Sequence, residues 1–362
     1  MFWRRNIGTL ILVFTVGAGM VGMVGMVGMV GMVGMVGMAG VAQASPRVAF
    51  GQPTEGTKVI LDDTSIDGPA IATTYAPATA LAWTGTDASH HLNVMTSSDG
   101  LHYNNKHILP ELSLWRPAIA FIDTGRGAPY GTIVLAWTGT DANHTLNVEF
   151  IKTPDFTVTR KVILWGETSF TAPALATVNG DINSDIYLSW AGTDSAHTVN
   201  VIHLTTSSDT TDKHTKWGWS SISRPNLSRS LDDGLILSWT GTNHNIYFAT
   251  AQEGANFVMP DASPLSLQTD WAPTMIGFDA TALPTHWLAW AGNGTSPTGN
   301  VNVQYTQSYP SWGDANSSAS LDETAISSPA LVYNGNGTSR QVLIGWAGTD
   351  QYNHLNIAVI SV

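Results

Sequence analysis

The sequence contains no cysteine. This absence excludes disulfide bonds, thiol catalysis, thiolate metal sites and anchoring through a lipid-modified cysteine. Charge is also scarce and unbalanced: 12% of the residues are charged, with 15 Lys and Arg against 27 Asp and Glu. A net charge of −12 repels nucleic acid and anionic lipid, so we expect neither as a partner. A hydrophobic content of 43% excludes a disordered chain.

Tryptophan, by contrast, is plentiful, and six of the 14 tryptophans mark a repeat of roughly 50 residues. Each repeat opens with proline and a short apolar segment, and continues with a β-branched run that ends in Trp-Thr-Gly or Trp-Ala-Gly. Such runs predict strands. The six marker residues are Trp83, Trp137, Trp190, Trp239, Trp290 and Trp346. A strand-built repeat of this length predicts a β-propeller.

The outer strand of the last repeat is predicted to come from the start of the domain. Residues 58–61 copy residues 161–164, the outer strand of the second repeat, whereas the sixth repeat reaches only its third strand. We therefore predict an all-β fold, a six-bladed β-propeller of four-stranded antiparallel blades whose ring is closed by an N-terminal strand that completes the last blade. Residues 45–362 form this single domain.

The N-terminal residues 1–44 are predicted to be an export signal. Arg4 and Arg5 precede a long apolar run that contains Val-Gly-Met triplets, and Ala42-Gln43-Ala44 offers a small-residue cleavage site. The run is long enough to span a bilayer, so a retained membrane anchor is the alternative. We accordingly expect a secreted or extracellular protein, anchored at its N-terminus if cleavage fails, and a monomer.

The loops that enter the first strand of each blade hold candidate ligand contacts. Trp115, Arg116, Arg224 and Trp271 stand where other blades carry smaller residues. An exposed Trp offers a flat face for a sugar ring, and Arg offers forked donors for hydroxyls or a carboxylate. The alternative is that the two tryptophans pack between blades. The same loops carry an acid and a hydroxyl at fixed places before the proline, which predicts turns that set the blade spacing.

The loops between the second and third strands repeat an Asp, a His and an Asn. A group that recurs in most blades is expected to do the same task in each, either a side-chain network that ties the hairpin together or one glycan site per blade. Spacing argues against zinc, because the ligands would have to converge from neighbouring loops. The residues are Asp87, His90, Asn93, Asp141, His144, Asn147, Asp194, His197, Asn200, Asp350, His354 and Asn356.

Two short motifs have more specific precedents. Residues 181–185 have the alternating oxygen ligands of a calcium loop but lack the rest of an EF-hand, so no cofactor is expected and calcium is only the alternative. Ser97-Ser-Asp-Gly-Leu-His-Tyr103 resembles the Asp box, a hairpin motif. Together with the six predicted blades and the export signal, this hairpin makes the chain similar to two groups of proteins. These are the sialidase-like, Asp-box (BNR-type) β-propeller superfamily and the six-bladed propeller lectins.

The resemblance implies a carbohydrate ligand. The leading hypothesis is a lectin-like, carbohydrate-binding propeller without turnover, whose partners are glycans or glycoconjugates. The first alternative is a sialidase-like exo-glycosidase that uses Asp67, Glu111 or Asp270 as acid or base beside the arginines. That family clamps its substrate with three arginines, and the third is missing from this sequence. The second alternative is an extracellular protein-interaction scaffold.

Overall fold

The structure is a computed structural model, and it describes residues 52–73, 78–123, 131–178, 185–204, 211–229, 234–252, 256–259, 263–277, 286–292, 299–306, 317–336 and 339–361. By its internal contacts the chain divides into Met1–Arg47 and Val48–Val362, and every described residue belongs to the second unit. The predictions for residues 1–44 therefore lie outside the described residues. Within the described ranges, no helix is long and apolar enough to cross a membrane.

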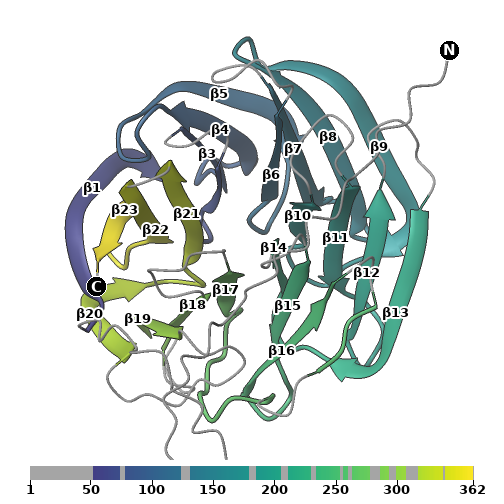
Figure 1. The fold of residues 1–362 in the computed structure, drawn as a ribbon. Coiled ribbons are helices and arrows are strands. Elements are labelled where there is room, and N and C mark those ends of the chain that lie inside the picture. The colour runs from purple at the N-terminus through teal and green to yellow at the C-terminus, as the bar shows by residue number, and fades with distance from the viewer. Residues whose placement is uncertain are drawn as a thin grey trace, which may run out of the picture. The chain divides into compact units, whose positions relative to one another are not determined.

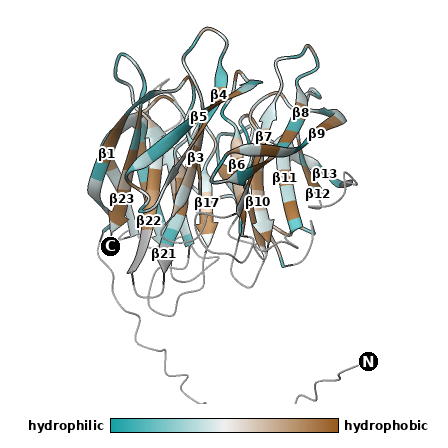
Figure 2. Ribbon diagram, turned by 90° about the horizontal axis from the view of Figure 1, so that it is seen from above, coloured by the Kyte–Doolittle hydropathy of each residue, from teal (hydrophilic) through white to brown (hydrophobic). Residues whose placement is uncertain are grey.

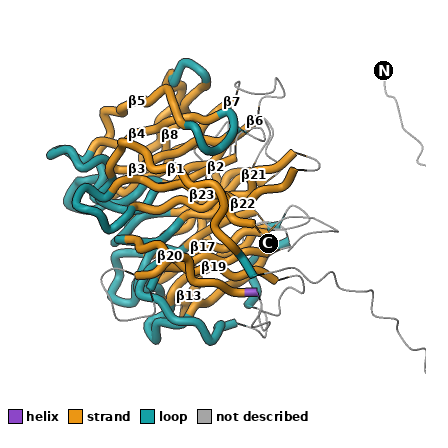
Figure 3. The backbone as a smooth tube through the Cα atoms, turned by 90° about the vertical axis from the view of Figure 1, so that its left-hand side faces the viewer, coloured by secondary structure: helices purple, strands orange, loops and turns teal. Residues whose placement is uncertain are grey.

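The second unit is a ring of six antiparallel sheets around a central axis (Figure 1). Regular structure in the described residues is almost entirely strand (Figure 3). The innermost strands each begin directly after the proline of a repeat, because proline presets the backbone but cannot donate to a ladder. They are β2 (Ala70–Thr73), β6 (Ala118–Asp123), β10 (Ala174–Val178), β14 (Asn226–Arg229), β17 (Thr274–Gly277) and β21 (Ala330–Asn336). Each contacts the next around the ring.

The second and third strands of each blade form its hairpin. The second strands, which carry the marker tryptophans, are β3 (Thr79–Thr84), β7 (Gly131–Thr138), β11 (Asp185–Ala191), β15 (Leu235–Thr240), β18 (His286–Ala291) and β22 (Ser339–Ala347). The third strands are β4 (His91–Ser97), β8 (Thr145–Thr153), β12 (Thr198–Leu204), β16 (Ile246–Ala251), β19 (Gly299–Thr306) and β23 (His354–Ser361). The outer strands are β5 (Tyr103–Leu112), β9 (Thr157–Thr168), β13 (Thr211–Ser220), β20 (Ser318–Ala325) and β1 (Thr54–Thr64).

The predicted fold and its closure are confirmed. Strand β1 pairs antiparallel with β23, from Thr54 opposite Ser361 to Thr64 opposite His354, so the first strand of the domain completes the sixth blade (Figure 1). Because β1 covers the edge of β23, the two ends of the domain are joined within one blade. The pairing removes an exposed strand edge that would invite aggregation.

Blade four differs from the other five. Its described residues form three regular strands, and two isolated bridges take the place of the fourth: Val258 with Thr250, and Gln268 with Asn245. Pro264 lies between these bridges and lacks an N–H group, so it cannot continue a ladder there.

The core lies between neighbouring blades. Val134 of blade two and Leu188 of blade three, for example, belong to the same buried cluster and are both fully inaccessible to solvent. Hydrophobic residues accordingly run along the strands rather than gathering at one face of the ring (Figure 2). Each blade covers the apolar face of the next, so stability depends on contacts between successive repeats.

At five of the six boundaries, a hydroxyl residue ties one blade to the next. Ser113 donates its N–H to His90 O at 3.2 Å within blade one, and its Oγ–H to Thr138 O at 2.9 Å in blade two. Ser65, Ser169, Ser221 and Thr269 make the equivalent pair of bonds at four other boundaries, whereas Ala325 takes this position before blade six. The hydroxyls that the sequence places before five of the six prolines thus link neighbouring blades, as predicted.

Candidate functional site

A repeated Trp–Lys–acid unit occupies the boundaries between blades. Its base is the marker tryptophan, which lies opposite Asn on the neighbouring third strand, as Trp83 does opposite Asn93. The ring is almost fully buried, with 1% of Trp83 exposed. The outer strand of the same blade places a lysine over the ring, and Lys106 Nζ lies 5.3 Å from the Trp83 ring centroid. This distance is within the range of a cation–π contact.

The third member of the unit comes from the preceding blade. Lys106 forms an ion pair with Asp63, which lies on β1 of blade six. At the next boundary Lys161 Nζ lies 2.6 Å from a Glu111 oxygen, and at the third Lys213 Nζ lies 2.5 Å from a Glu167 oxygen. The four copies in the described residues are Trp83, Lys106 and Asp63; Trp137, Lys161 and Glu111; Trp190, Lys213 and Glu167; and Trp346, Lys58 and Glu323.

Blades four and five have replaced the whole unit. The position of the acid before blade four is taken by Trp219, whose ring stacks on Trp239 with 4.9 Å between centroids, and Tyr247 stacks on Trp239 at 5.5 Å. Before blade five the acid position holds Leu267, and Ser318 stands at the lysine position in blade five. Lysine and acid are thus lost together, which indicates that they act as one unit.

The predicted hairpin residues lie beside this unit. Asp141 Oδ1 accepts from Asn143 N at 3.0 Å and from Thr145 Oγ1 at 3.0 Å, and its Oδ2 accepts from Thr145 N at 3.0 Å. Asn147 Nδ2 donates to Thr145 O at 2.8 Å. Asp87, Asp194 and Asp350 make equivalent bonds, as do Asn93, Asn200 and Asn356. In the structure, these side chains tie the hairpin together.

The histidines of this motif play two different parts. His90, His144 and His197 have φ of 58°, 55° and 48°, so they occupy the left-handed position of the turn, and their carbonyls accept the bonds from the hydroxyl residues. In blade six that position is held by Asn353 with φ of 56°. His354 follows it and contacts Asp350 Oδ1 through Nδ1 at 2.7 Å, as His91 contacts Asp87 at 2.8 Å. In the sequence, the blade-six histidine therefore stands one residue later than in the other three copies, while the turn keeps the same geometry with Asn353 in the left-handed position, since Asn, like His, tolerates this conformation.

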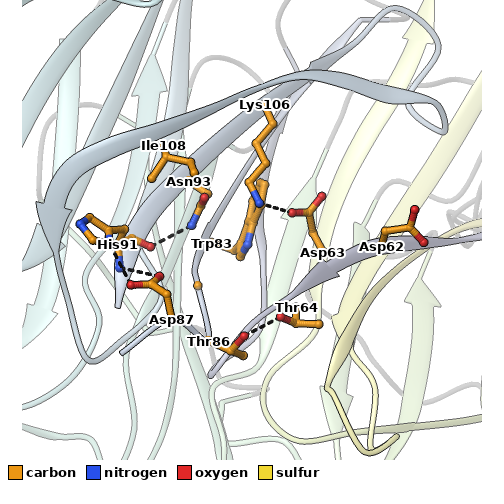
Figure 4. A pocket seen from close by; sticks show the side chains of 11 residues that line it. Asp62, Asp63, Thr64, Trp83, Thr86, Asp87, His91, Asn93, Lys106 and Ile108 are labelled. Atoms are coloured by element: carbon orange, nitrogen blue, oxygen red, sulfur yellow. Dashed lines mark hydrogen bonds and ion pairs between the residues drawn. The ribbon is translucent and has the colours of Figure 1, made fainter. Parts of the chain in front are cut away.

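The boundary between blades six and one contains a cavity of about 450 Å³. Lys106 extends across Trp83 toward Asp63, Thr64 and Thr86 are joined by a 2.6 Å hydrogen bond, and Ile108 flanks the opening (Figure 4). Further lining comes from Asp62, Asp87, His91 and Asn93. The equivalent threonines are also bonded at two other boundaries, Thr168 with Thr193 at 2.7 Å and Thr324 with Thr349 at 2.6 Å.

The charged groups of the cavity are mostly negative. Its lining includes three carboxylates, one ammonium and one imidazole. Burial raises the pKa of Asp87, but hydrogen bonds from His91 and from the Ser89 N–H outweigh it, so the net effect is a lowered pKa and a charged carboxylate at neutral pH. Ile108, 59% exposed, adds an apolar edge to this array of donors and acceptors. Such a surface suits a neutral polyol with an apolar side and disfavours an anion.

The second boundary contains an additional carboxylate. Glu149 is 2% exposed, and its Oε1 lies 3.7 Å from Lys161 Nζ. The same lysine also pairs with Glu111. Burial, followed by the neighbouring Glu111, raises the pKa of Glu149 to about 7. This boundary therefore carries a carboxyl group that changes charge near neutral pH.

The four predicted rim contacts lie around the start of the inner strands. Trp115 is half-buried, with its ring 5.1 Å from His144, and Trp271 packs against the core of blades five and six. Their carbonyls accept from Thr84 Oγ1 and Thr240 Oγ1, each at 2.6 Å, which links neighbouring blades. Arg116 and Arg224 are each only 5% exposed. Sugar contacts by these four residues stay a prediction, and their burial limits what they can touch.

The three predicted catalytic carboxylates have separate partners. Asp67 Oδ2 accepts from Arg116 N at 3.1 Å, Glu111 pairs with Lys161, and Asp270 Oδ1 lies 2.5 Å from His244 Nδ1. In the part of the chain that the structure describes, these three do not share a partner. Each carboxylate therefore has a structural contact of its own.

The two remaining motifs have different outcomes. In the hairpin at residues 97–103, Asp99 Oδ1 accepts from Leu101 N at 2.9 Å and His102 N at 2.8 Å, while Ser97 Oγ accepts from Gly100 N at 2.9 Å. These bonds close a compact turn, and its assignment as an Asp box stays a prediction. The calcium loop at 181–185 falls outside the described residues except for its last position. Among the described residues, no three His, Cys, Asp or Glu side chains converge on a metal site.

The four lysines of the unit were missed at the level of sequence. Lys58, Lys106 and Lys161 each stand five or six residues before the acid of the following loop. Lys213 stands six residues before Trp219, at the same place in its blade, and this periodicity is visible in the sequence. The sequence does not show that each lysine lies over the tryptophan of its own blade while pairing with an acid from the blade before. That relation depends on the register of the outer strands.

Comparisons with known proteins agree with this architecture. Neither protein-family models nor curated proteins give a match. Among solved structures, a fungal lectin from Aleuria aurantia, described as a six-bladed β-propeller with fucose recognition, matches with a TM-score of 0.60 at 10% identity, covering 84% of this chain and 96% of the lectin. The chain has the fold of the six-bladed propeller lectins.

Two further solved structures show the same fold. AofleA from Arthrobotrys oligospora matches with a TM-score of 0.57 at 11% identity, covering 84% of this chain and 90% of that one. A subtype N10 neuraminidase-like protein (little yellow-shouldered bat, Guatemala) matches with a TM-score of 0.53 at 10% identity, covering 84% and 98%. The predicted resemblance to propeller lectins and to sialidase-like propellers is therefore confirmed at the level of fold.

Proposed function

We propose that this protein is a secreted or surface-displayed lectin-like propeller that binds neutral sugars in the pockets between its blades, without turnover and without a cofactor. The observation that carries the proposal is the Trp–Lys–acid unit, repeated at four of the boundaries with the same lysine–carboxylate ion pair. A repeated site at a repeated boundary is the arrangement expected of a multivalent binder, because several weak sites together give high avidity.

The chemistry of the pocket favours a neutral ligand. Its carboxylates accept hydrogen bonds from sugar hydroxyls, Lys106 and His91 donate to them, and Ile108 offers an apolar surface to the C–H side of the ring. The excess of carboxylates repels the acid group of a sialylated glycan. The fucose lectins among the structural neighbours support the ligand class.

The test is saturation-transfer NMR on the full chain with L-fucose, D-galactose, D-mannose and N-acetylneuraminic acid. We expect transfer to at least one neutral sugar and none to the acidic one. A variant with methionine at Lys58, Lys106, Lys161 and Lys213 should lose the signal, because each pocket loses its ammonium donor while the aliphatic stem still covers the tryptophan. Lys152→Met, an exposed lysine away from the units, is the matched control and should keep it.

A second variant separates the pockets from the rim. Trp115→Ala with Trp271→Ala should retain transfer if the sugar lies between the outer strands. Loss of transfer in this rim variant but not in the lysine variant would refute the pocket assignment. Silence with every neutral sugar would refute carbohydrate binding, and new free-sugar signals from a glycoside panel would refute binding without turnover.

A further inference from the structure

One end of the central channel gathers two buried arginines. Arg116 and Arg224 stand directly before the prolines that start β6 and β14, so both lie at the same end of the inner strands. Arg116 Nη1 donates to Ser328 O, in the loop before β21, at 2.9 Å. Blades two and six are separated by blade one in the ring. The Arg116 side chain therefore reaches across the start of blade one along the channel end.

A third loop converges on the same place. A Cβ atom added to Gly68, just before β2, would lie 2.5 Å from Ser328 O, 2.8 Å from Ser327 Oγ and 3.3 Å from Arg116 Nη1. Only glycine fits so close to these atoms. The loops before three inner strands thus pack tightly around the arginine, and the site is shaped by backbone rather than by mobile side chains.

The charges at this end do not balance. The Asp67 carboxylate interacts with both guanidinium groups, and the two guanidinium groups repel each other. Arginine remains protonated in proteins, so among the described residues one carboxylate, that of Asp67, interacts with two fixed positive charges. Both arginines are buried, with only 5% of each exposed to solvent. A buried charge without a partner is strongly unfavourable, and an anion would neutralise it.

The unpaired hydrogen-bonding groups lie in the same loops. Arg224 Nε and Nη2, together with Ser223 Oγ and Ser327 Oγ, are buried and have no hydrogen-bond partner among the described residues. Nε and Nη2 form one edge of the guanidinium, and this fork matches two oxygens of a carboxylate, phosphate or sulfate group. Buried polar groups are normally satisfied, so their clustering here points to a ligand.

We propose that the channel end bounded by Arg116, Arg224, Ser223 and Ser327 binds a small oxyanion, which Arg224 holds through its Nε–Nη2 edge. The burial of both arginines restricts the ligand to a carboxylate, phosphate or sulfate group rather than a whole sugar ring. This site is independent of the proposed sugar pockets, which lie on the outer strands and are negatively charged.

The experiment is thermal unfolding of the full chain in increasing acetate, phosphate or sulfate, at an ionic strength held constant with sodium chloride. A ligand at 100 times its Kd shifts the unfolding equilibrium about 100-fold, and its effect saturates. We expect a saturable rise in Tm with one of the three anions, and the anion that gives it identifies the group. Salts also stabilise proteins by exclusion from the surface, but that effect does not saturate.

Variants make the test specific. Arg224→Met should abolish the saturable rise, and in chloride alone it should be at least as stable as the wild type because it removes the unpaired charge. Arg224→Lys keeps the charge but lacks the fork, and should weaken binding at least 10-fold, about 1.4 kcal/mol. Arg229→Met, at the opposite end of β14, is the control. An equal rise in wild type and Arg224→Met, or its loss in Arg229→Met as well, would overturn the proposal.

Discussion

Replacing Lys106 by methionine tests whether the Trp–Lys–acid unit holds the blades together. The change removes the ammonium that lies 5.3 Å from the Trp83 ring centroid and pairs with Asp63, while the aliphatic stem remains. The Lys106 side chain is 41% exposed and the Asp63 side chain 16% exposed, so both contacts are partly solvated. A partly exposed cation–π contact is worth about 0.5–1 kcal/mol and such an ion pair about 0.2–1 kcal/mol.

The expected loss of unfolding free energy is therefore about 1–2 kcal/mol. It is measured by urea denaturation at 25 °C with linear extrapolation. A double-mutant cycle with Asp63→Asn should give a coupling energy of about 0.2–1 kcal/mol that shrinks in 1 M salt. Lys152→Met, on the exposed side of β8, should change stability by no more than about 0.5 kcal/mol. A coupling energy of zero, or an equal loss in both lysine variants, would refute the assignment of Lys106 to a unit.

Three further predictions concern stability. Ser113→Ala should lower the unfolding free energy by about 1–3 kcal/mol in urea denaturation, because it leaves the buried Thr138 carbonyl without its donor, whereas the exposed Ser89→Ala should have little effect. Burial lowers the pKa of His286 to about 4, so the stability of its neutral form is present above pH 6.5 and is lost as the pH falls toward 4. Urea unfolding at pH 7.5 and 4.5 should show about 2–3 kcal/mol of loss that His286→Phe reduces; an unchanged loss in that variant would contradict this. Glu149 has its pKa raised to about 7, so the wild type loses stability as the pH rises from 4.5 to 7. Relative to the wild type, the unfolding free energy of Glu149→Gln should therefore be higher by roughly 1–3 kcal/mol at pH 8 and little changed at pH 5. A difference between variant and wild type that is the same at both pH values would refute the raised pKa.

The repeat was sufficient to predict the architecture because it marks positions that the backbone itself requires. Prolines open every inner strand, and the copy of residues 161–164 at 58–61 identifies the closing strand before any contact is known. The outer edge of blade four was harder to predict, because Pro264 lacks the N–H that a continuous outer strand needs and two isolated bridges form instead. Local sequence signals therefore predict the regular blades well, and the irregular outer edge of blade four less well.

The candidate site shows where sequence reasoning stops. The acids before the prolines were recognised as a repeat, but their lysine partners lie on another blade, and only the outer-strand register brings Lys161 to Glu111. The arginines were placed on the correct loops, yet Arg116 is held by Ser328 from a distant part of the chain and is buried as a result. Contacts between repeats, rather than residues within one repeat, decide both features.

Isothermal titration of the full chain with the neutral sugar that shows saturation transfer tests the central claim most directly, because it counts the sites. Four equivalent Trp–Lys–acid units predict about four equivalent sites per chain, and each Lys→Met substitution should remove one. A single site that survives all four lysine substitutions, or that disappears with Trp115→Ala, would contradict the account and return the ligand to the rim of the channel.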